Sequence, residues 1–234
     1  MAPLVGVVVF PGTNCEFDVI EAVRSLGGDA TPLWHGDRSL GAVDAVVVPG
    51  GFAHGDYLRP GAIARFSPVM NAVADFANSG GPVVGICNGF QVLTEAGLLP
   101  GALQKNRGLK FLCRMTELEV AASDTTLTTG VAVGTRLRIP INHFEGNYTC
   151  NAETLAELEG DGRVVFRYVD NPNGSMNDIA GICNAGRNVV GLMPHPERAS
   201  ATLLGSTDGI PLLQSLLTCA GVSPGGRAVA AVGA

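Results

Sequence analysis

The nine residues VVGICNGFQ, at positions 83–91, contain a short apolar run that stops at Cys87 and is followed by Asn88-Gly89. Such an uninterrupted run is typical of a strand buried on both faces of a parallel sheet. The residues after it, NGFQVLTEAGLL, have apolar side chains at helical spacing. A buried strand that passes directly into a helix at a cysteine predicts a nucleophile elbow. Gly85, Cys87 and Gly89 form G-x-C-x-G, the cysteine version of G-x-S-x-G.

The surroundings predicted for Cys87 suit a nucleophile. The start of a helix offers free backbone N–H groups and the positive end of the helix dipole, and both favour a thiolate over a thiol. The carboxyl end of a strand is also where open α/β folds bind their ligands. The alternative is that Cys87 is a buried structural thiol, because cysteine commonly packs as a small hydrophobic residue.

The same alternation of strand and helix runs through the first half of the chain. Strands are predicted at residues 4–10, 30–34, 42–51 and 82–86, and helices at 14–27, 62–81 and 88–99. After residue 118, short runs separated by turns predict mixed or antiparallel strands, and a last helix is predicted at 210–220. We expect an α/β fold with an open, twisted, mostly parallel sheet flanked by helices, and added antiparallel strands. One domain would cover residues 1–220, followed by a Gly/Ala-rich tail at 221–234.

The composition of the chain excludes several classes of protein. Of 234 residues, 46% are hydrophobic and 15% charged, which predicts a globular protein with a sizeable core. The formal net charge is -6 and no basic run occurs, so we expect no nucleic-acid partner. Apolar runs are all shorter than the roughly 20 residues of a membrane helix, and the first residues show no signal peptide. We therefore expect a cytoplasmic protein without a membrane partner.

The 6 cysteines and 4 histidines predict neither disulfides nor a metal site. No C-x-x-C or H-x-x-x-H pair occurs, whereas zinc ligands usually come as closely spaced pairs. Disulfides are not expected in a chain of this length without an export signal. Burial is the default expectation for the five other cysteines, Cys15, Cys113, Cys150, Cys183 and Cys219.

A nucleophilic cysteine needs a base, and His195 is the candidate. It lies in GLMPHPERA directly after another apolar run, and the ends of neighbouring parallel strands meet at one edge of the sheet. Glu197 follows two residues later, on the same face of an extended segment, so its carboxylate can orient the imidazole. The alternative is a loop histidine beside a glutamate that starts a helix.

An acyl-transfer reaction also needs an oxyanion hole, and the loop PGGFAHGDYLRPG at 49–61 is the candidate. Gly50 and Gly51 allow the backbone to approach a ligand closely. We expect the N–H groups of Phe52 and Asn88 to converge on one carbonyl oxygen. The alternative is a plain glycine turn. Gln91 lies one helical turn beyond Cys87 and is expected to face the same pocket.

Taken together, PGG, GICNGFQ and PHPE resemble the motifs of the class I, or triad, glutamine amidotransferases. Longer stretches resemble the glutaminase subunits of phosphoribosylformylglycinamidine synthase over nearly the whole chain up to Cys219. These stretches are VVVFPGTNCEFD, GGFAHGDYLRPGAIA, ICNGFQVLTEAGLLPGAL, NPNGSMNDIAGICN and MPHPERA. The resemblance implies that the chain hydrolyses L-glutamine through a thioester on Cys87. His195 would shuttle the proton and Glu197 would orient His195.

The resemblance also implies partners. Ammonia would pass to a large ATP-dependent synthetase subunit, which converts formylglycinamide ribonucleotide to the amidine in purine biosynthesis, and a small third subunit would complete the complex. ATP and magnesium belong to the large subunit, so no cofactor is implied for this chain. By the same resemblance Gln91, Asn106 and Phe111 would line the glutamine site. The segment P-x-x-H-x-E-G would place His143 and Glu145 near the pocket or the synthetase interface. The alternative for each is an ordinary polar loop residue.

Some residues depart from the family pattern. Ala53 and His54 stand where the oxyanion loop is expected to have Ser and Tyr, and Phe144 replaces a small residue. Asn14, Asp56, Arg59 and the run 171–175 are weaker interface or loop candidates. Three other functions stay open: a glutaminase of another pathway, a cysteine hydrolase or chaperone-like protein of the same fold, and a non-catalytic regulatory subunit. The last two are disfavoured by the PHPE segment and the intact Cys87, His195 and Glu197.

Overall fold

The apolar runs predicted as strands form the parallel half of a sheet. The computed structural model describes residues 2–222. In this part of the chain, β1 (Leu4–Val9), β2 (Asp29–Trp34), β3 (Ala45–Val48), β4 (Val83–Ile86) and β11 (Val189–Leu192) run parallel in the order β2-β1-β3-β4-β11. Every residue of β3, β4 and β11 is buried, as expected for strands that are covered on both faces.

The second half of the sheet is antiparallel, as predicted from the short runs after residue 118. Beyond β11 follow β10 (Ile179–Cys183), β9 (Val164–Tyr168), β6 (Leu112–Val120) and β7 (Arg136–His143), each antiparallel to its neighbour. These strands extend the parallel strands into one nine-stranded sheet within residues 2–222. The predicted α/β class and the added antiparallel strands are confirmed.

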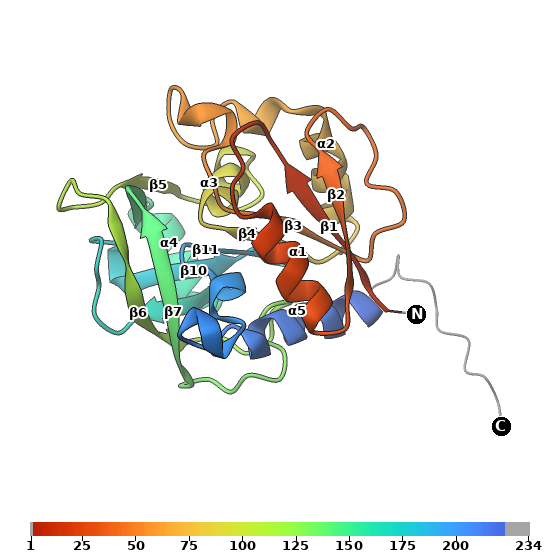
Figure 1. The fold of residues 1–234 in the computed structure, drawn as a ribbon. Coiled ribbons are helices and arrows are strands. Elements are labelled where there is room, and N and C mark those ends of the chain that lie inside the picture. The colour runs from red at the N-terminus through yellow and green to blue at the C-terminus, as the bar shows by residue number, and fades with distance from the viewer. Residues whose placement is uncertain (1, 223–234) are drawn as a thin grey trace.

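Helices cover both faces of the parallel strands (Figure 1). The helices α1 (Glu16–Ser25) and α5 (Ile210–Val222) contact each other on one face, and α2 (Pro68–Asn78) and α3 (Asn88–Glu95) lie on the other. The buried positions of α1 are Val19, Ile20, Ala22 and Val23, which form the apolar stripe of an amphipathic helix. None of the helices in residues 2–222 combines the length and the apolar character needed to span a membrane.

Three features differ from the sequence prediction. The helix predicted at 62–81 is broken into a 3-10 turn at Ala64–Phe66 and α2, because Ser67 is extended (φ -64°, ψ 139°), the conformation that a residue before proline favours. The strands β5 (Ala102–Lys105) and β8 (Glu145–Thr149) form a separate antiparallel pair, and α4 (Ala152–Gly160) precedes β9. The sequence analysis predicted neither this strand pair nor α4. For β5 the reason is that the strand is nowhere fully buried and carries no clear apolar alternation.

The boundary predicted between domain and tail is only partly described. Residues 221 and 222 continue α5 and do not begin the tail. The rest of the predicted tail, residues 223–234, lies outside the described residues, so the division of the chain into 1–220 and 221–234 stays a prediction.

The segments that follow β1, β3, β4 and β11 all leave the sheet at its carboxyl edge. They carry Cys15, Gly50, Cys87 and His195, respectively. Parallel strands thus bring together residues that are far apart in the sequence, and this edge is where open α/β sheets bind ligands.

Candidate active site

Cys87 lies at a strained turn between β4 and α3. Its φ of 51° and ψ of -106° are unusual for a residue with a side chain, and α3 begins at the next residue. The turn is closed by a hydrogen bond from the Cys87 N–H to the carbonyl of Leu192 in β11 (2.8 Å). This is the strand–turn–helix arrangement of a nucleophile elbow.

The glycine after Cys87 allows α3 to approach β3. A Cβ on Gly89 would lie 1.8 Å from the carbonyl oxygen of Val48, and a Cβ on Gly85 would lie 2.7 Å from the carbonyl oxygen of Gly89. Both distances are far shorter than a van der Waals contact, so larger residues would push the helix away from the sheet. The small residues of G-x-C-x-G are therefore required by packing around the turn.

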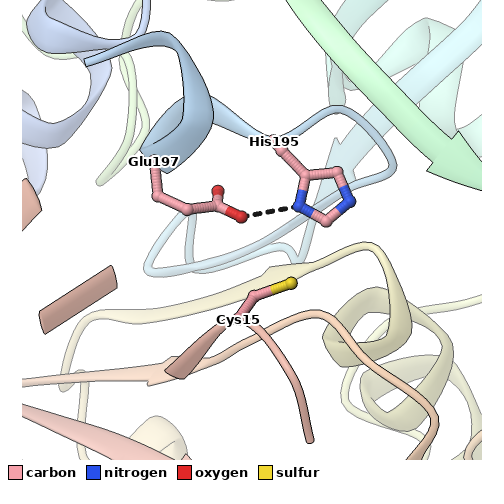
Figure 2. A group of neighbouring side chains, drawn as sticks. All are labelled: Cys15, His195 and Glu197. Carbon is pink, nitrogen blue, oxygen red and sulfur yellow. Dashed lines mark hydrogen bonds and ion pairs between the residues drawn. The ribbon is translucent and has the colours of Figure 1, made fainter. Parts of the chain in front are cut away.

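His195 and Glu197 form a buried pair in the turn after β11 (Figure 2). Nδ1 of His195 lies 2.6 Å from Oε1 of Glu197, and the two side chains are 2% and 0% exposed. Because the carboxylate accepts this bond, Nδ1 carries the proton and Nε2 is left for chemistry. Burial disfavours the imidazolium, but the charges of Glu197 and Cys87 outweigh it and hold the pKa of His195 well above its ordinary value.

The side chains of Cys15, Cys87 and His195 all pack around Gly50. A Cβ on this residue would lie 2.7 Å from Cε1 of His195, 3.0 Å from Sγ of Cys15 and 3.5 Å from Cβ of Cys87. Only a glycine leaves room for the three side chains to converge. The structure therefore brings together the predicted Cys87, His195 and Glu197. Nε2 of His195 has no hydrogen-bond partner within residues 2–222, and the Cys87 thiol donates to the carbonyl of Asn142 (3.6 Å).

Cys15 is a site residue that the sequence analysis missed. Its thiol lies beside the His195–Glu197 pair in Figure 2, and Nη2 of Arg198 donates a hydrogen bond to Sγ (3.2 Å) while also pairing with Asp18 (2.9 Å). The signal was available, because NCEFD follows the first parallel strand and must therefore lie at the carboxyl edge of the sheet.

The same group contains donor atoms of the kind that bind zinc. Sγ of Cys15, a ring nitrogen of His195 and a carboxylate oxygen of Glu197 lie within 4.8 Å of one another. The histidine and carboxylate atoms already bond to each other, however, and the Arg198 guanidinium beside the sulfur would repel a cation. These residues therefore fit an oriented imidazole better than a metal ion.

The oxyanion prediction needs one correction. The N–H of Phe52 donates to the carbonyl of Gly12 (2.9 Å), because residue 51 pairs with Thr13 in an isolated antiparallel bridge. It therefore cannot also point at a substrate. The N–H of Asn88 lies in the first turn of α3 and has no acceptor within the helix, so it stays a candidate. Gly51 lines the cavity and is the other backbone candidate on the loop.

Hydrogen bonds of the Asn88 side chain connect the loop at 49–61 to α3. Oδ1 of Asn88 accepts from the N–H of Ala53 (2.9 Å), and its Nδ2 donates to Oε1 of Gln91 (2.8 Å) and to Oδ1 of Asp56 (3.1 Å). Burial raises the pKa of Asp56 to about 6; the bond from Asn88 opposes this shift, and the Glu145 carboxylate adds to it. Three residues of this loop with side chains, His54, Asp56 and Leu58, have positive φ, so the loop is strained and depends on these bonds.

His54 does not reach the site. Its ring packs edge-on against His35 at 5.1 Å between centroids, and its Nε2 lies 3.3 Å from the Ser67 hydroxyl. Ala53 is buried, and its backbone N–H bonds to Asn88. The two departures from the family pattern in this loop therefore leave the backbone close to Cys87 in place.

A cavity of about 300 Å³ opens in front of Cys87 and His195. This volume is at the small end of ligand pockets and suits a molecule of amino-acid size. Gln91 lines it and donates from Nε2 to the carbonyl of Glu145. The weaker candidates Asn14, Asp56 and Arg59 also line the cavity, together with Lys105, His143 and Glu145.

The remaining predicted residues take other positions. Asn106 is buried and lies behind His143: its Oδ1 bonds to Nδ1 of His143 (3.1 Å). Phe111 is 48% exposed and is not among the described residues that line the cavity, so its predicted contact with glutamine stays a prediction. In the run 171–175, Asn173 donates to the carbonyl of Gly146 (2.8 Å) and supports the turn after His143.

A cysteine elbow, a buried His–Glu pair and a glycine loop on an open α/β sheet define the class I glutamine amidotransferases, and comparisons with known proteins agree. Residues 2–208 match the family model of the CobB/CobQ-like glutamine amidotransferase domain. The chain is 59% identical over 218 residues to phosphoribosylformylglycinamidine synthase subunit PurQ of Rubrobacter xylanophilus, which covers 93% of this chain and 99% of the relative. It is 57% identical to the same subunit of Cereibacter sphaeroides, over 90% of this chain and 96% of the relative.

Solved structures agree with these relatives. A chain in the structure of PurLQS from Thermotoga maritima superposes with a TM-score of 0.87 and is 42% identical, covering 93% of this chain and 99% of that chain. A putative GMP synthase subunit from Thermoplasma acidophilum has a TM-score of 0.67 at 17% identity, over 94% of this chain and 95% of that one, and this likeness concerns the fold alone. The chain belongs to the CobB/CobQ-like glutamine amidotransferases and, within them, to the PurQ family.

Proposed function

We propose that this chain is the glutaminase subunit of phosphoribosylformylglycinamidine synthase. It hydrolyses L-glutamine to glutamate and ammonia, and ammonia then converts formylglycinamide ribonucleotide to formylglycinamidine ribonucleotide on the synthetase subunit, in one step of purine biosynthesis. The main support is the arrangement of the site. Cys87 lies at a strained turn and meets the buried His195–Glu197 pair above Gly50. A cavity of amino-acid size lies beside them. Membership of the PurQ family supports the particular pathway.

The first half of the reaction forms a thioester. The Cys87 thiol gives its proton to Nε2 of His195, the resulting sulfur anion attacks the carboxamide carbon of glutamine, and negative charge develops on the oxygen. The N–H groups of Asn88 and Gly51 stabilise this charge, and the start of α3 adds its dipole. The C–N bond then breaks, and the nitrogen leaves as ammonia after it takes a proton from Nε2 of His195. Glu197 keeps the imidazole in the orientation and tautomer for this transfer.

The second half releases glutamate. Nε2 of the now neutral His195 accepts a proton from water, and the hydroxide attacks the thioester carbon. The C–S bond breaks, glutamate departs, and the imidazolium and the sulfur anion are restored together. The raised pKa of His195 suits both halves, because it keeps the proton on the ring when no acceptor is present.

The synthetase subunit docks around the mouth of the cavity in this proposal. Three apolar side chains that line the mouth are exposed to solvent: Phe52 (48%), Leu58 (89%) and Phe144 (37%). Exposed apolar side chains grouped around a site are typical of an interaction surface. Docking there would cover the cavity and seal it against loss of ammonia, so we predict that the isolated chain is a poor glutaminase.

Several features of the complex rest on the family alone. The small third subunit, the use of ATP and magnesium by the synthetase rather than by this chain, and a cytoplasmic location are proposals of this kind. The rival pathways, in which a glutaminase supplies GMP, CTP or carbamoyl phosphate synthesis, are disfavoured by the identity to PurQ proteins.

The test uses the complete complex and two nitrogen sources. Wild-type chain with its synthetase and small subunits should form the amidine from either glutamine or ammonium salt. The variant Cys87→Ala should lose glutamine-dependent synthesis and keep ammonia-dependent synthesis. Glutamine-dependent synthesis that survives in this variant would show that Cys87 is not the nucleophile. Failure of the wild-type complex to use formylglycinamide ribonucleotide would refute the pathway.

A further inference from the structure

The active-site cavity contains a second buried histidine with an unused ring nitrogen. His143 ends β7, is 3% exposed and lines the cavity together with Cys87 and His195. Its Nε2 is buried and has no hydrogen-bond partner within residues 2–222. Buried polar atoms are nearly always bonded, so this unpaired atom needs a functional explanation.

The hydrogen bonds of Asn106 determine which nitrogen of His143 carries the proton. Nδ2 of Asn106 donates to the carbonyls of Lys110 (2.9 Å) and His143 (3.0 Å), so both of its protons are used and the orientation of the amide is fixed. Oδ1 of Asn106 then faces Nδ1 of His143 at 3.1 Å and also accepts from the N–H of Gly146 (3.2 Å). An amide oxygen can only accept, so Nδ1 is the protonated nitrogen.

The ring is neutral at physiological pH. Burial lowers the pKa of His143 to about 4, and the neighbouring charge of His195 adds to the shift. With the proton on Nδ1, Nε2 of the neutral ring is a bare lone pair, which can accept a hydrogen bond and cannot donate one. The two histidines of the cavity are thus held in opposite states, His195 as a proton donor and His143 as an acceptor.

The strand that carries His143 contacts both reacting groups. The carbonyl of Pro140 accepts from the N–H of His195 (2.9 Å), and the carbonyl of Asn142 accepts from the Cys87 thiol (3.6 Å). His143 is the next residue on this strand. Because His143 also lines the cavity, it lies in the cavity wall beside the two reacting groups, where the carboxamide of glutamine would bind.

We propose that Nε2 of His143 accepts a hydrogen bond from the carboxamide nitrogen of glutamine and holds the ammonia that leaves. This inference rests on the proposed glutaminase function. A carboxamide nitrogen has two N–H bonds, and binding one of them orients the nitrogen. Its lone pair, freed from resonance when Cys87 adds to the carbonyl carbon, then meets the proton on His195. His143 itself transfers no proton. A ring that stays neutral also leaves ammonia unprotonated and able to act as a nucleophile.

The test compares two substrates that differ in their leaving group. Glutamine loses a nitrogen that carries N–H bonds, whereas the γ-methyl ester of glutamate loses a methoxy group that has none. In His143→Asn, the new amide can still donate to Asn106 but presents no acceptor at the position of Nε2. We expect the ratio of kcat/KM for glutamine to that for the ester to fall about tenfold, the effect of one hydrogen bond. His143→Gln places a carbonyl oxygen near Nε2 and should restore the ratio to within about threefold of wild type.

Both substrates are measured on the same preparation of the complete complex, so a partial loss of folded protein cancels in the ratio. His143→Ala serves the same purpose if His143→Asn is not recovered. An equal loss for both substrates, or a ratio that the glutamine variant does not restore, would overturn the role of His143. A wild-type complex that hydrolyses neither substrate would instead refute the glutaminase function itself.

Discussion

Nδ1 of His195 lies 2.6 Å from Oε1 of Glu197, and only Pro196 separates the two residues in the chain. The contact is possible because Pro196 opens a 3-10 turn, Pro196–Ala199, directly after His195. Both side chains are buried, so little solvent screens the carboxylate from the ring.

The variant Glu197→Gln tests this pair. It keeps the shape of the side chain and removes the charge, so the imidazolium loses its partner and the pKa of His195 falls. We expect kcat for glutamine to drop by about two orders of magnitude or more, as in triads that lose their carboxylate. The basic limb of the pH profile of kcat/KM should also move to lower pH, because the protonated ring is lost earlier. A basic limb that stays in place would mean that Glu197 does not set the charge state of His195.

The backbone strain at Cys87 can be measured as stability. A φ of 51° and ψ of -106° is the mirror image of an ordinary extended conformation, which glycine adopts freely and alanine does not. We expect Cys87→Gly to be more stable than Cys87→Ala by about 1 kcal/mol in urea unfolding, since relief of strain exceeds the extra entropy of glycine in the unfolded chain. If the alanine variant were the more stable of the two, the turn would not be strained.

Gly89 in α3 is predicted to tolerate no larger residue. In Gly89→Ala the new methyl group would overlap the carbonyl oxygen of Val48, so α3 must move off the sheet. We expect a loss of about 3 kcal/mol or more in the free energy of unfolding. Gly160→Ala is the matched control, because Gly160 is also helical and its added methyl group meets no atom within 4 Å. Comparable losses in the two variants would contradict the packing argument.

Asp56 should make stability depend on pH. Its pKa is about 6 in the folded chain and about 3.8 in the unfolded chain, so the folded state holds its proton more tightly. The resulting stabilisation is complete below pH 4 and is lost as the pH rises through 6. Asp56→Asn keeps an acceptor for Asn88 and does not titrate, so its stability should rise relative to wild type between pH 4 and pH 7. A difference that is constant across this range, measured by urea unfolding, would rule out the shift.

The apolar rim of the cavity predicts where the synthetase subunit binds. Leu58 is 89% exposed and has a φ of 70°, a conformation that aspartate tolerates better than leucine. Leu58→Asp should therefore fold normally and weaken binding to the synthetase by about tenfold or more. Val133→Asp is the control, because Val133 precedes Arg136 at the end of β7 opposite to His143 and is also exposed. Equal binding by both variants in a titration would place the interface elsewhere.

The nucleophile elbow was predictable because its determinants are local. The apolar run before Cys87, the glycines on either side and the helical spacing after it all act within one strand and one helix. The pairing with Glu197 was also predictable from its place two residues after His195, but the expected extended segment was wrong, because residues 196–199 form a 3-10 turn. The hydrophobic pattern of the parallel strands also predicted that the segments after them meet at one edge, because strands of this kind can be buried only side by side.

Tertiary structure alone decided the rest. The N–H of Phe52 is turned away because Gly12, 40 positions earlier, accepts its proton. The thiol of Cys15 meets Arg198 from the other end of the chain, and the free nitrogen of His143 follows from a bond to Asn106 in a different segment. Each of these is a choice of hydrogen-bond partner among groups far apart in sequence. Residue types and spacing therefore fixed which groups could react, and the folded chain fixed which of their protons and lone pairs are free to do so.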